Sequence, residues 1–321
     1  MADINVVVEV DDGVLNDISL QCIGAARALA DGGRVRCLTA GQGAAGTAAD
    51  LFALGADEVK TFEDSRVAAY TTRPYRKAVT TWLVEAQPAL VLFGSTTLGD
   101  DLAASVAAAL PAACVLAADG VDAVDGGFAA RRMEYDRKVQ TTYAPAQNGL
   151  LIVSLNDGAA EMPATDASRT GEAIPLQVEI DEADLAARVL KRDVAKKTVN
   201  LKDAKVIVAA GAGVGSAEGL AVVQQLADAL GAEVGATRAV IDAGWLAADH
   251  QIGQTGATVR PDLYIACGIS GAVQHQVGML DARKIIAINT DAHAPIFRIA
   301  HYQVVGDLKV VIPKLLKAVA S

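Results

Sequence analysis

Residues 263–289 carry the densest chemical signal in this sequence. An apolar run, residues 263–267, is followed by a glycine-hinged polar stretch, residues 268–275, and then by a second apolar run, residues 285–289. Apolar runs of this length between glycines are typical of parallel strands that are covered on both faces. Ligands of such sheets bind beyond the carboxyl ends of the strands. The segment therefore predicts a nucleotide site on the polar stretch.

A second polar loop, residues 251–256, precedes this segment. It combines amide and hydroxyl groups with two glycines, Gly253 and Gly256, so its backbone can approach a planar ligand closely. Turn chemistry alone could account for either loop. Together the two loops offer N–H, O–H and imidazole groups to one cofactor, and this clustering favours a shared binding site.

Arg238 is one of the few cations between Leu201 and Arg260, and it does not stand in a run of charges. An isolated arginine needs an anionic partner. That partner is either a bound ligand or a neighbouring carboxylate, Asp242 or Glu233. Taken alone, Arg238 favours the ion pair.

A glycine turn, residues 211–216, lies between a predicted strand and a predicted helix. Backbone N–H groups at such a position can bind phosphate. The spacing departs from GxGxxG, because Gly213 is followed by Val214-Gly215-Ser216. A phosphate contact and a tight strand-to-helix connection are therefore equally compatible with this turn.

Metal chemistry and acyl transfer find little support. The four histidines show no HxxxH or HExxH spacing, and no GxSxG elbow is present. The cysteines are far apart and lie mostly in apolar runs, which indicates buried thiols in a reducing compartment; they are Cys22, Cys37, Cys114 and Cys267. We expect no metal site and no catalytic residue.

Composition excludes several classes of function. The chain has 321 residues, of which 52% are apolar and 4% aromatic, and its net charge is −10. Negative charge opposes binding to nucleic acid or to an anionic membrane. A predicted strand begins at Ile4, which leaves no room for a leader, and no apolar run approaches the roughly 20 residues that span a bilayer. We expect a cytoplasmic protein without membrane insertion.

Apolar runs alternate with amphipathic stretches along the first part of the chain, which implies parallel strands joined by helical crossovers. The predicted strands here are residues 4–10, 35–38, 58–61 and 89–93. Three half-buried strands follow, and we expect them to extend or edge the same domain. They are residues 128–133, 138–143 and 150–155.

The alternation restarts with a strand at residues 205–210 and ends with a strand at 296–304 and a helix at 308–320. A basic cluster, residues 191–197, separates the two patterned regions and is expected to be a solvated linker. The sequence therefore predicts an α/β protein with two doubly wound, largely parallel-sheet domains, residues 1–197 and 198–321.

Several motifs together resemble the carboxyl-terminal FAD domain of the electron-transfer flavoprotein alpha subunit. The matching pieces are Thr237-Arg238, residues 251–256, residues 263–275 with Gly278, Ile288-Asn289, residues 294–297 and Gly306-Asp307. The resemblance implies a Rossmann-like second domain that binds FAD. It implies the following cofactor-binding residues: Thr237, Arg238, Gln251, Ile252, Gly253, Gln254, Thr255, Ser270, Gly271, Ala272, Val273, Gln274, His275, Asn289 and Asp307.

The resemblance also implies roles within this set. Thr255 faces flavin N5, His275 lies near the O2 edge, and Arg238 lies over the ring. Residues 270–274, with Thr237 and residues 252–254, hold the ribityl chain and pyrophosphate, whereas Asn289 and Asp307 hold the adenosine end. The chain departs from the family at Ala212, where many members carry arginine, and this departure removes a candidate phosphate partner from the glycine turn.

Partners follow from the same resemblance. It implies a heterodimer with a beta subunit of related amino-terminal fold, flavin dehydrogenases as electron donors, and a quinone oxidoreductase or another acceptor. The chain would be an electron carrier rather than an enzyme that converts a substrate. Three alternatives stay open: an electron-bifurcating flavoprotein that uses NADH, an NAD-dependent dehydrogenase with Glu233 as its ribose ligand, and a nucleotide-binding regulatory protein.

Overall fold

The chain folds into two compact units, Met1–Arg192 and Asp193–Ser321. The computed structural model describes residues 2–135, 137–146, 149–192, 199–202 and 204–319. The boundary expected at Lys197 lies outside the described residues. On either side of it, Arg192 pairs with Asp11 of the first unit, and Val199 and Leu201 pack into a core of the second.

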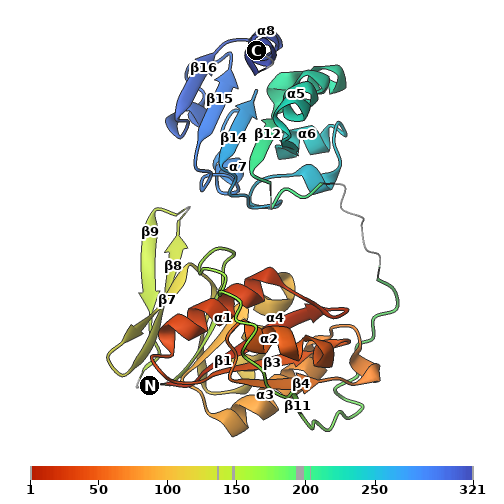
Figure 1. The fold of residues 1–321 in the computed structure, drawn as a ribbon, viewed down its shortest axis with the longest axis vertical. Helices are drawn as coiled ribbons and strands as arrows, with labels where there is room; N and C mark the ends of the chain where they lie inside the picture. The colour runs from red at the N-terminus through yellow and green to blue at the C-terminus, as the bar shows by residue number, and fades with distance from the viewer. Residues whose placement is uncertain (1, 136, 147–148, 193–198, 203, 320–321) are drawn as a thin grey trace. The chain divides into compact units, whose positions relative to one another are not determined.

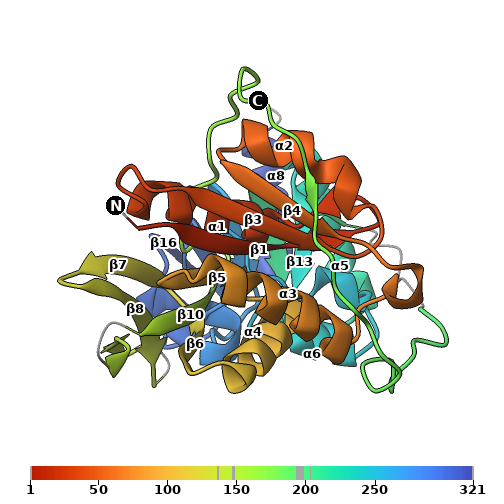
Figure 2. The same ribbon diagram turned by 90° about the horizontal axis from the view of Figure 1, so that it is seen from below.

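The first unit is built on one large twisted sheet (Figures 1 and 2). Its strand order is β11-β4-β3-β1-β5-β10-β6, and every neighbouring pair along this path is parallel. The elements of this unit are β1 (Ile4–Asp11), β2 (Val14–Leu15), α1 (Asp17–Leu29), β3 (Val35–Ala40), η1 (Ala44–Thr47), α2 (Ala48–Ala53), β4 (Glu58–Phe62), η2 (Ser65–Val67), α3 (Thr72–Ala86), β5 (Leu90–Gly94), α4 (Thr97–Ala109), β6 (Ala112–Ala118), β7 (Gly120–Val124), β8 (Gly127–Glu134), β9 (Val139–Tyr143), β10 (Leu150–Leu155) and β11 (Ile174–Pro175).

Helices cover both faces of this sheet. Alternate residues of a strand point to opposite faces, so Val6 packs with α1 and α2 whereas Val7 packs with α3 and α4. The helix α1 begins where the side chain of Asn16 accepts the N–H of Ile18. This two-layer burial accounts for the apolar strands and the amphipathic helices of the sequence.

The strands after Gly120 differ from their expected arrangement. β10 is buried and lies inside the large sheet, between β5 and β6. The other two pair with β7 in a separate antiparallel sheet, β7-β8-β9. Pairing with distant strands, which local pattern does not reveal, separates β10 from its sequence neighbours.

The second unit has a smaller sheet of order β13-β12-β14-β15-β16, in which every pair is parallel. Its elements are β12 (Val206–Ala210), η4 (Ala212–Val214), α5 (Ala217–Leu230), β13 (Glu233–Ala236), α6 (Arg238–Asp242), η5 (Ala248–His250), β14 (Leu263–Cys267), α7 (Val273–Gln276), β15 (Ile285–Asn289), η6 (Pro295–Arg298), β16 (Tyr302–Val305) and α8 (Leu308–Val319).

Different layers cover the two faces of the second sheet. Val208 and Ala210 pack under α5 and α8, whereas Ile207 and Ala209 pack under the segments around Ile252, Met279 and Ile296. The expected strand at 296–304 is wrong over residues 296–301, because η6 occupies Pro295–Arg298 and the strand begins only at Tyr302. The predicted fold class, two doubly wound and largely parallel α/β domains, is confirmed.

Candidate functional site

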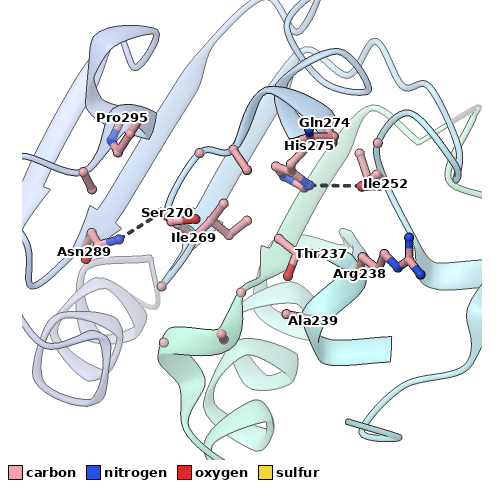
Figure 3. A pocket seen from close by; sticks show the side chains of 18 of the residues that line it. Thr237, Arg238, Ala239, Ile252, Ile269, Ser270, Gln274, His275, Asn289 and Pro295 are labelled. Carbon is pink, nitrogen blue, oxygen red and sulfur yellow. Dashed lines mark hydrogen bonds between the residues drawn. The ribbon is translucent and has the colours of Figure 1, made fainter. Parts of the chain in front are cut away.

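A cavity of about 740 Å³ lies within the second unit, at the carboxyl ends of its strands (Figure 3). This is the edge of a parallel sheet where nucleotides bind, and the volume is typical of a small-molecule site. Its walls are Gly211, Ala212, Gly213, Thr237, Arg238, Ala239, Gln251, Ile252, Gly253, Gln254, Thr255, Gly268, Ile269, Ser270, Gly271, Ala272, Gln274, His275, Asn289, Asp291, Ala294 and Pro295.

Close backbone packing forms the floor of the cavity between β12 and β14. The N–H of Gly213 donates to the carbonyl oxygen of Gly268 at 2.9 Å. A Cβ on Gly211 would lie 2.3 Å from that same oxygen. Gly268 has a φ of +64°, which favours glycine. These glycines are therefore required for the two strand ends to meet.

The two polar loops are interlocked and form one wall. The N–H of Gln254 donates to the carbonyl oxygen of Gln274 at 2.7 Å, and the N–H of Val259 donates to that of Gly278 at 2.8 Å. The imidazole of His275 contacts the carbonyl oxygen of Ile252 at 3.0 Å. The structure thus places both predicted loops at a single cavity.

His275 is buried in this wall, and both of its ring nitrogens have partners. Nδ1 lies 3.0 Å from the Ile252 carbonyl oxygen and Nε2 lies 3.0 Å from the hydroxyl of Tyr264. Burial lowers the pKa of His275 to about 4, although the Ile252 carbonyl partly opposes this change. His275 therefore contributes a neutral ring to the cavity.

Unused donors gather on the loop that follows β14. Among the described residues, no acceptor faces the backbone N–H groups of Ser270, Gly271 and Ala272. Gly271 has a φ of +86°, and its N–H belongs to a run of consecutive backbone donors without an acceptor among the described residues. Such a run binds anionic oxygen atoms.

The glycine turn after β12 differs in this respect. The N–H groups of Gly211, Gly213, Val214 and Gly215 all donate to carbonyl oxygens of the protein. The hydroxyl of Ser216 accepts the N–H of Gly219 and so caps α5. Four donors of residues 211–216 are thus used within the protein, which favours a tight strand-to-helix connection, whereas the N–H groups of Ala212 and Ser216 have no acceptor among the described residues.

Thr237 stands at the start of α6, where a threonine normally caps the helix. Its side chain makes no capping hydrogen bond. Its Oγ1 is buried and has no partner among the described residues. A buried hydroxyl without a partner is costly, and this one belongs to a residue that lines the cavity. The orphan hydroxyl therefore points to a missing ligand.

Arg238 is the one cationic side chain among the described residues that line the cavity. Its Nε lies 3.3 Å from Oδ2 of Asp242, one helical turn further along α6. Both side chains are more than 60% exposed, so the pair is weak. Of the two carboxylates considered as partners of Arg238, the structure pairs it with Asp242, and it also places Arg238 at the wall of the cavity.

Thr255 and Gln251 interact across their loop. The amide Nε2 of Gln251 donates to the hydroxyl oxygen of Thr255 at 2.8 Å. The hydroxyl hydrogen of Thr255 is therefore directed away from Gln251, because the amide nitrogen is a donor only. Thr255 can donate to an acceptor in the cavity.

Asn289 joins the ends of β14 and β15. Its Nδ2 donates to the Ile269 carbonyl oxygen at 2.8 Å (Figure 3), and its Oδ1 accepts the N–H of Asp291 at 2.9 Å. Asp307 lies outside the cavity lining; its carboxylate accepts the N–H of Lys309 at the start of α8. The N–H of Gly306 donates to the Asn289 carbonyl oxygen, which connects the two regions.

The cavity collects all the sequence-predicted residues except Val273 and Asp307. Val273 is 46% exposed on α7. Sequence reasoning missed two residues that line the cavity, Ala239 and Asp291. Each lies shortly after a strand, and that position was the signal available. Gly268 and Ile269 belong to the predicted polar stretch, and Ala294 and Pro295 belong to the motifs of the resemblance.

Two further properties of the described residues concern membranes and metal ions. They contain no helix with the length and apolar character needed to cross a membrane. They also contain no group of three or more histidine, cysteine and acidic side chains that is arranged to hold a metal ion.

Comparison with known proteins identifies two matching family models. Residues 4–181 match the electron transfer flavoprotein domain, and residues 200–280 match the electron transfer flavoprotein FAD-binding domain.

Similar proteins match along nearly their whole length. The electron transfer flavoprotein subunit alpha of Thermoanaerobacterium thermosaccharolyticum is 37% identical over 99% of this chain and 97% of its own. Protein FixB of Azotobacter vinelandii is 38% identical over 98% and 89%. A thiamine diphosphate-dependent 4-hydroxybenzoylformate decarboxylase of Rhodococcus jostii RHA1 matches at 12% identity with a TM-score of 0.22; this chain spans about half of its length, 54%, and the likeness carries no argument.

Proposed function

Because this chain belongs to the family of electron transfer flavoprotein alpha subunits, we propose that its cofactor, FAD, binds in the cavity of the second unit and that the chain carries electrons between partner proteins. FAD supplies the one- and two-electron chemistry when bound, and the protein positions it and tunes its potential. The observation that carries the placement of FAD is the buried, unpartnered hydroxyl of Thr237 at a helix start.

The donors of the cavity fit the pyrophosphate. The free N–H groups of Ser270, Gly271 and Ala272 lie in sequence order along one wall, and Thr237 adds its hydroxyl. Neutral donors can hold a dianion without a cluster of lysines or arginines. We assign the pyrophosphate and ribityl chain to these groups together with residues 252–254.

The flavin ring is assigned to the side formed by Arg238, Thr255 and His275. Arg238 would place positive charge against a ring that becomes negative on reduction. Thr255, whose hydroxyl hydrogen is free, would donate to flavin N5. His275 would present a neutral ring near the O2 edge, because both of its nitrogens are already hydrogen-bonded.

The adenosine end is assigned to the region beyond β15. Asn289 holds the Ile269 carbonyl in place, and Asp291 lines the cavity two residues later. A carboxylate after a strand of such a sheet can accept hydrogen bonds from ribose hydroxyls. Asp307 follows Gly306, which is bonded to Asn289, and would contact the same end of the cofactor.

The partner proposed for the chain is a beta subunit, since membership of the alpha-subunit family implies one. Flavin dehydrogenases are proposed as donors and a quinone oxidoreductase or another redox protein as the acceptor. Among the described residues that line the cavity, the ionisable side chains are those of Arg238, His275 and Asp291. None is assigned to substrate turnover: Arg238 is placed at the flavin ring, Asp291 at the adenosine end, and His275 is buried and neutral. This arrangement suits an electron carrier.

Co-expression of the chain with its beta subunit tests this function. The purified complex should be yellow and contain one FAD for each alpha subunit. A flavin dehydrogenase with its substrate should reduce that FAD, and an added quinone oxidoreductase should reoxidise it. A colourless complex that takes up no FAD would contradict the proposal.

The same preparation separates the alternatives. A second FAD, reducible by NADH, would identify an electron-bifurcating protein. Glu233, the residue considered as a ribose ligand for NAD, is exposed at the start of β13 and is outside the cavity lining. A complex that binds NAD instead of FAD would support the dehydrogenase alternative.

A further inference from the structure

Tyr264 is a buried polar side chain to which neither the sequence nor the proposed function assigns a role. It lies in the middle of the second sheet, on β14, and is fully buried. Its hydroxyl is 3.0 Å from Nε2 of His275, and the two rings are tilted by 54° with centroids 6.2 Å apart. Burial raises the pKa of Tyr264 well above its ordinary value, so the hydroxyl keeps its hydrogen at neutral pH.

The hydrogen-bond partners fix the direction of each bond. A backbone carbonyl can only accept, so Nδ1 of His275 must carry the hydrogen that faces Ile252. In the neutral ring Nε2 is then an acceptor, and the Tyr264 hydroxyl donates to it. Removal of either partner would leave a buried polar atom unsatisfied.

We propose that Tyr264 is a positioning residue of the flavin site, which acts by donating to Nε2 of His275 and so holds the imidazole as a fixed, neutral wall of the cavity. The chain of bonds runs from β14 through His275 to the carbonyl oxygen of Ile252 on the loop of residues 251–256. It ties that loop to the rigid centre of the sheet. The functional consequence rests on the proposed function, namely that FAD occupies the cavity.

Two consequences follow for the bound cofactor. With Nε2 occupied, His275 offers no free nitrogen to the flavin, and the positive charge of the described lining comes from Arg238. The loop that carries Gln251 and Thr255 is also fixed in place by a bond that originates in the core. Loss of Tyr264 would therefore release both the ring and the loop.

The test uses the full chain labelled with ¹⁵N-histidine, in complex with unlabelled beta subunit and FAD, and long-range ¹H–¹⁵N NMR at pH 7. The His275 signals are those lost in His275→Gln. They should show Nδ1 protonated and Nε2 unprotonated, with a Nε2 shift typical of a hydrogen-bond acceptor. In Tyr264→Phe the Nε2 signal should move downfield, whereas Tyr302→Phe, at a tyrosine that is 60% exposed, should leave it unchanged.

A double-mutant cycle links the bond to the cofactor. The complex is first depleted of FAD and then titrated with it. Tyr264→Phe should weaken FAD binding roughly fivefold, because the loss of one hydrogen bond costs about 1 kcal/mol. In a His275→Ala background the same change should have little further effect, because the bond is already absent.

Three results would overturn the inference: a protonated Nε2 in the wild-type protein, a Nε2 signal that Tyr264→Phe does not move, or an equal loss of affinity in both backgrounds. If the complex binds no FAD, the proposed function fails, while the NMR signature still tests the bond between Tyr264 and His275.

Discussion

At the scale of single residues, the polar groups around the cavity are of two kinds: some are hydrogen-bonded within the protein, and others have no partner among the described residues. The side-chain polar atoms of Asn289 are hydrogen-bonded to neighbouring backbone, and those of His275 to the Ile252 carbonyl oxygen and the Tyr264 hydroxyl. The hydroxyl of Thr237 and the N–H groups of residues 270–272 are of the second kind. Substitutions in the second set should therefore affect cofactor binding more than stability.

Thr237→Val replaces the orphan hydroxyl by a methyl group of the same shape. Without ligand, the free energy of unfolding should stay the same or rise slightly, because an unsatisfied buried group is removed. FAD affinity should fall roughly fivefold, since about 1 kcal/mol of hydrogen bonding is lost. Titration of depleted complex with FAD measures this, and Thr258→Val at an exposed position outside the lining is the matched control. Lower stability with unaltered affinity would contradict the prediction.

Arg238→Ala should lower the potential of the first one-electron reduction of bound FAD. An exposed charge near the ring contributes at least about 1 kcal/mol, or roughly 40 mV for one electron. Arg238→Lys keeps the charge and should retain most of the potential. Spectroelectrochemical titration compares the three proteins; equal potentials would show that Arg238 serves only its ion pair with Asp242.

His275 should make stability depend on pH. Its pKa is about 4 in the folded chain, against 6.5 for an ordinary histidine, so between these values the unfolded state binds a proton that the native state does not. The free energy of unfolding therefore falls as pH decreases from about 6.5 to about 4, by up to roughly 3 kcal/mol.

Urea unfolding of cofactor-free chain across this range measures the pH effect. His275→Gln should remove this part of the pH slope, and His293→Gln, at an exposed residue, should retain it. Equal slopes in His275→Gln and wild type would refute the assignment.

At the scale of elements, glycines decide how the strand ends meet. Gly211, Gly213 and Gly268 allow backbone contact between the turn after β12 and the end of β14. The sequence pattern indicated that the turn was either a phosphate site or a tight connection, and its occupied N–H groups favour the connection.

Gly211→Ala should therefore destabilise the second unit by at least roughly 2 kcal/mol, because the added Cβ would lie 2.3 Å from a backbone oxygen. Gly46→Ala, where no atom lies within 4 Å of the added Cβ, should change little. Thermal unfolding monitored by circular dichroism would test both, and a Gly211→Ala chain as stable as wild type would exclude close packing at this turn.

At the scale of the whole molecule, the two units have separate sheets and separate cores. We propose that residues 1–197 and 198–321 are independent domains. FAD contacts assigned to the second domain should stabilise that domain alone.

Calorimetry of the chain should accordingly show two unfolding transitions, and FAD should raise the midpoint temperature of only one of them. Thr237→Val should reduce the shift of that transition and leave the other unchanged. A single cooperative transition, or an equal shift of both, would contradict independent domains.

The sequence by itself determined the α/β class, the two polar loops and, through its motifs, the family. Periodicity and glycine placement are local properties that every strand–turn–helix unit displays in its own residues. The interior place of β10 and the hydrogen bond between Tyr264 and His275 were decided only by the tertiary structure. Strand order depends on partners far along the chain, and a donor is free or occupied according to which distant acceptor the fold brings to it.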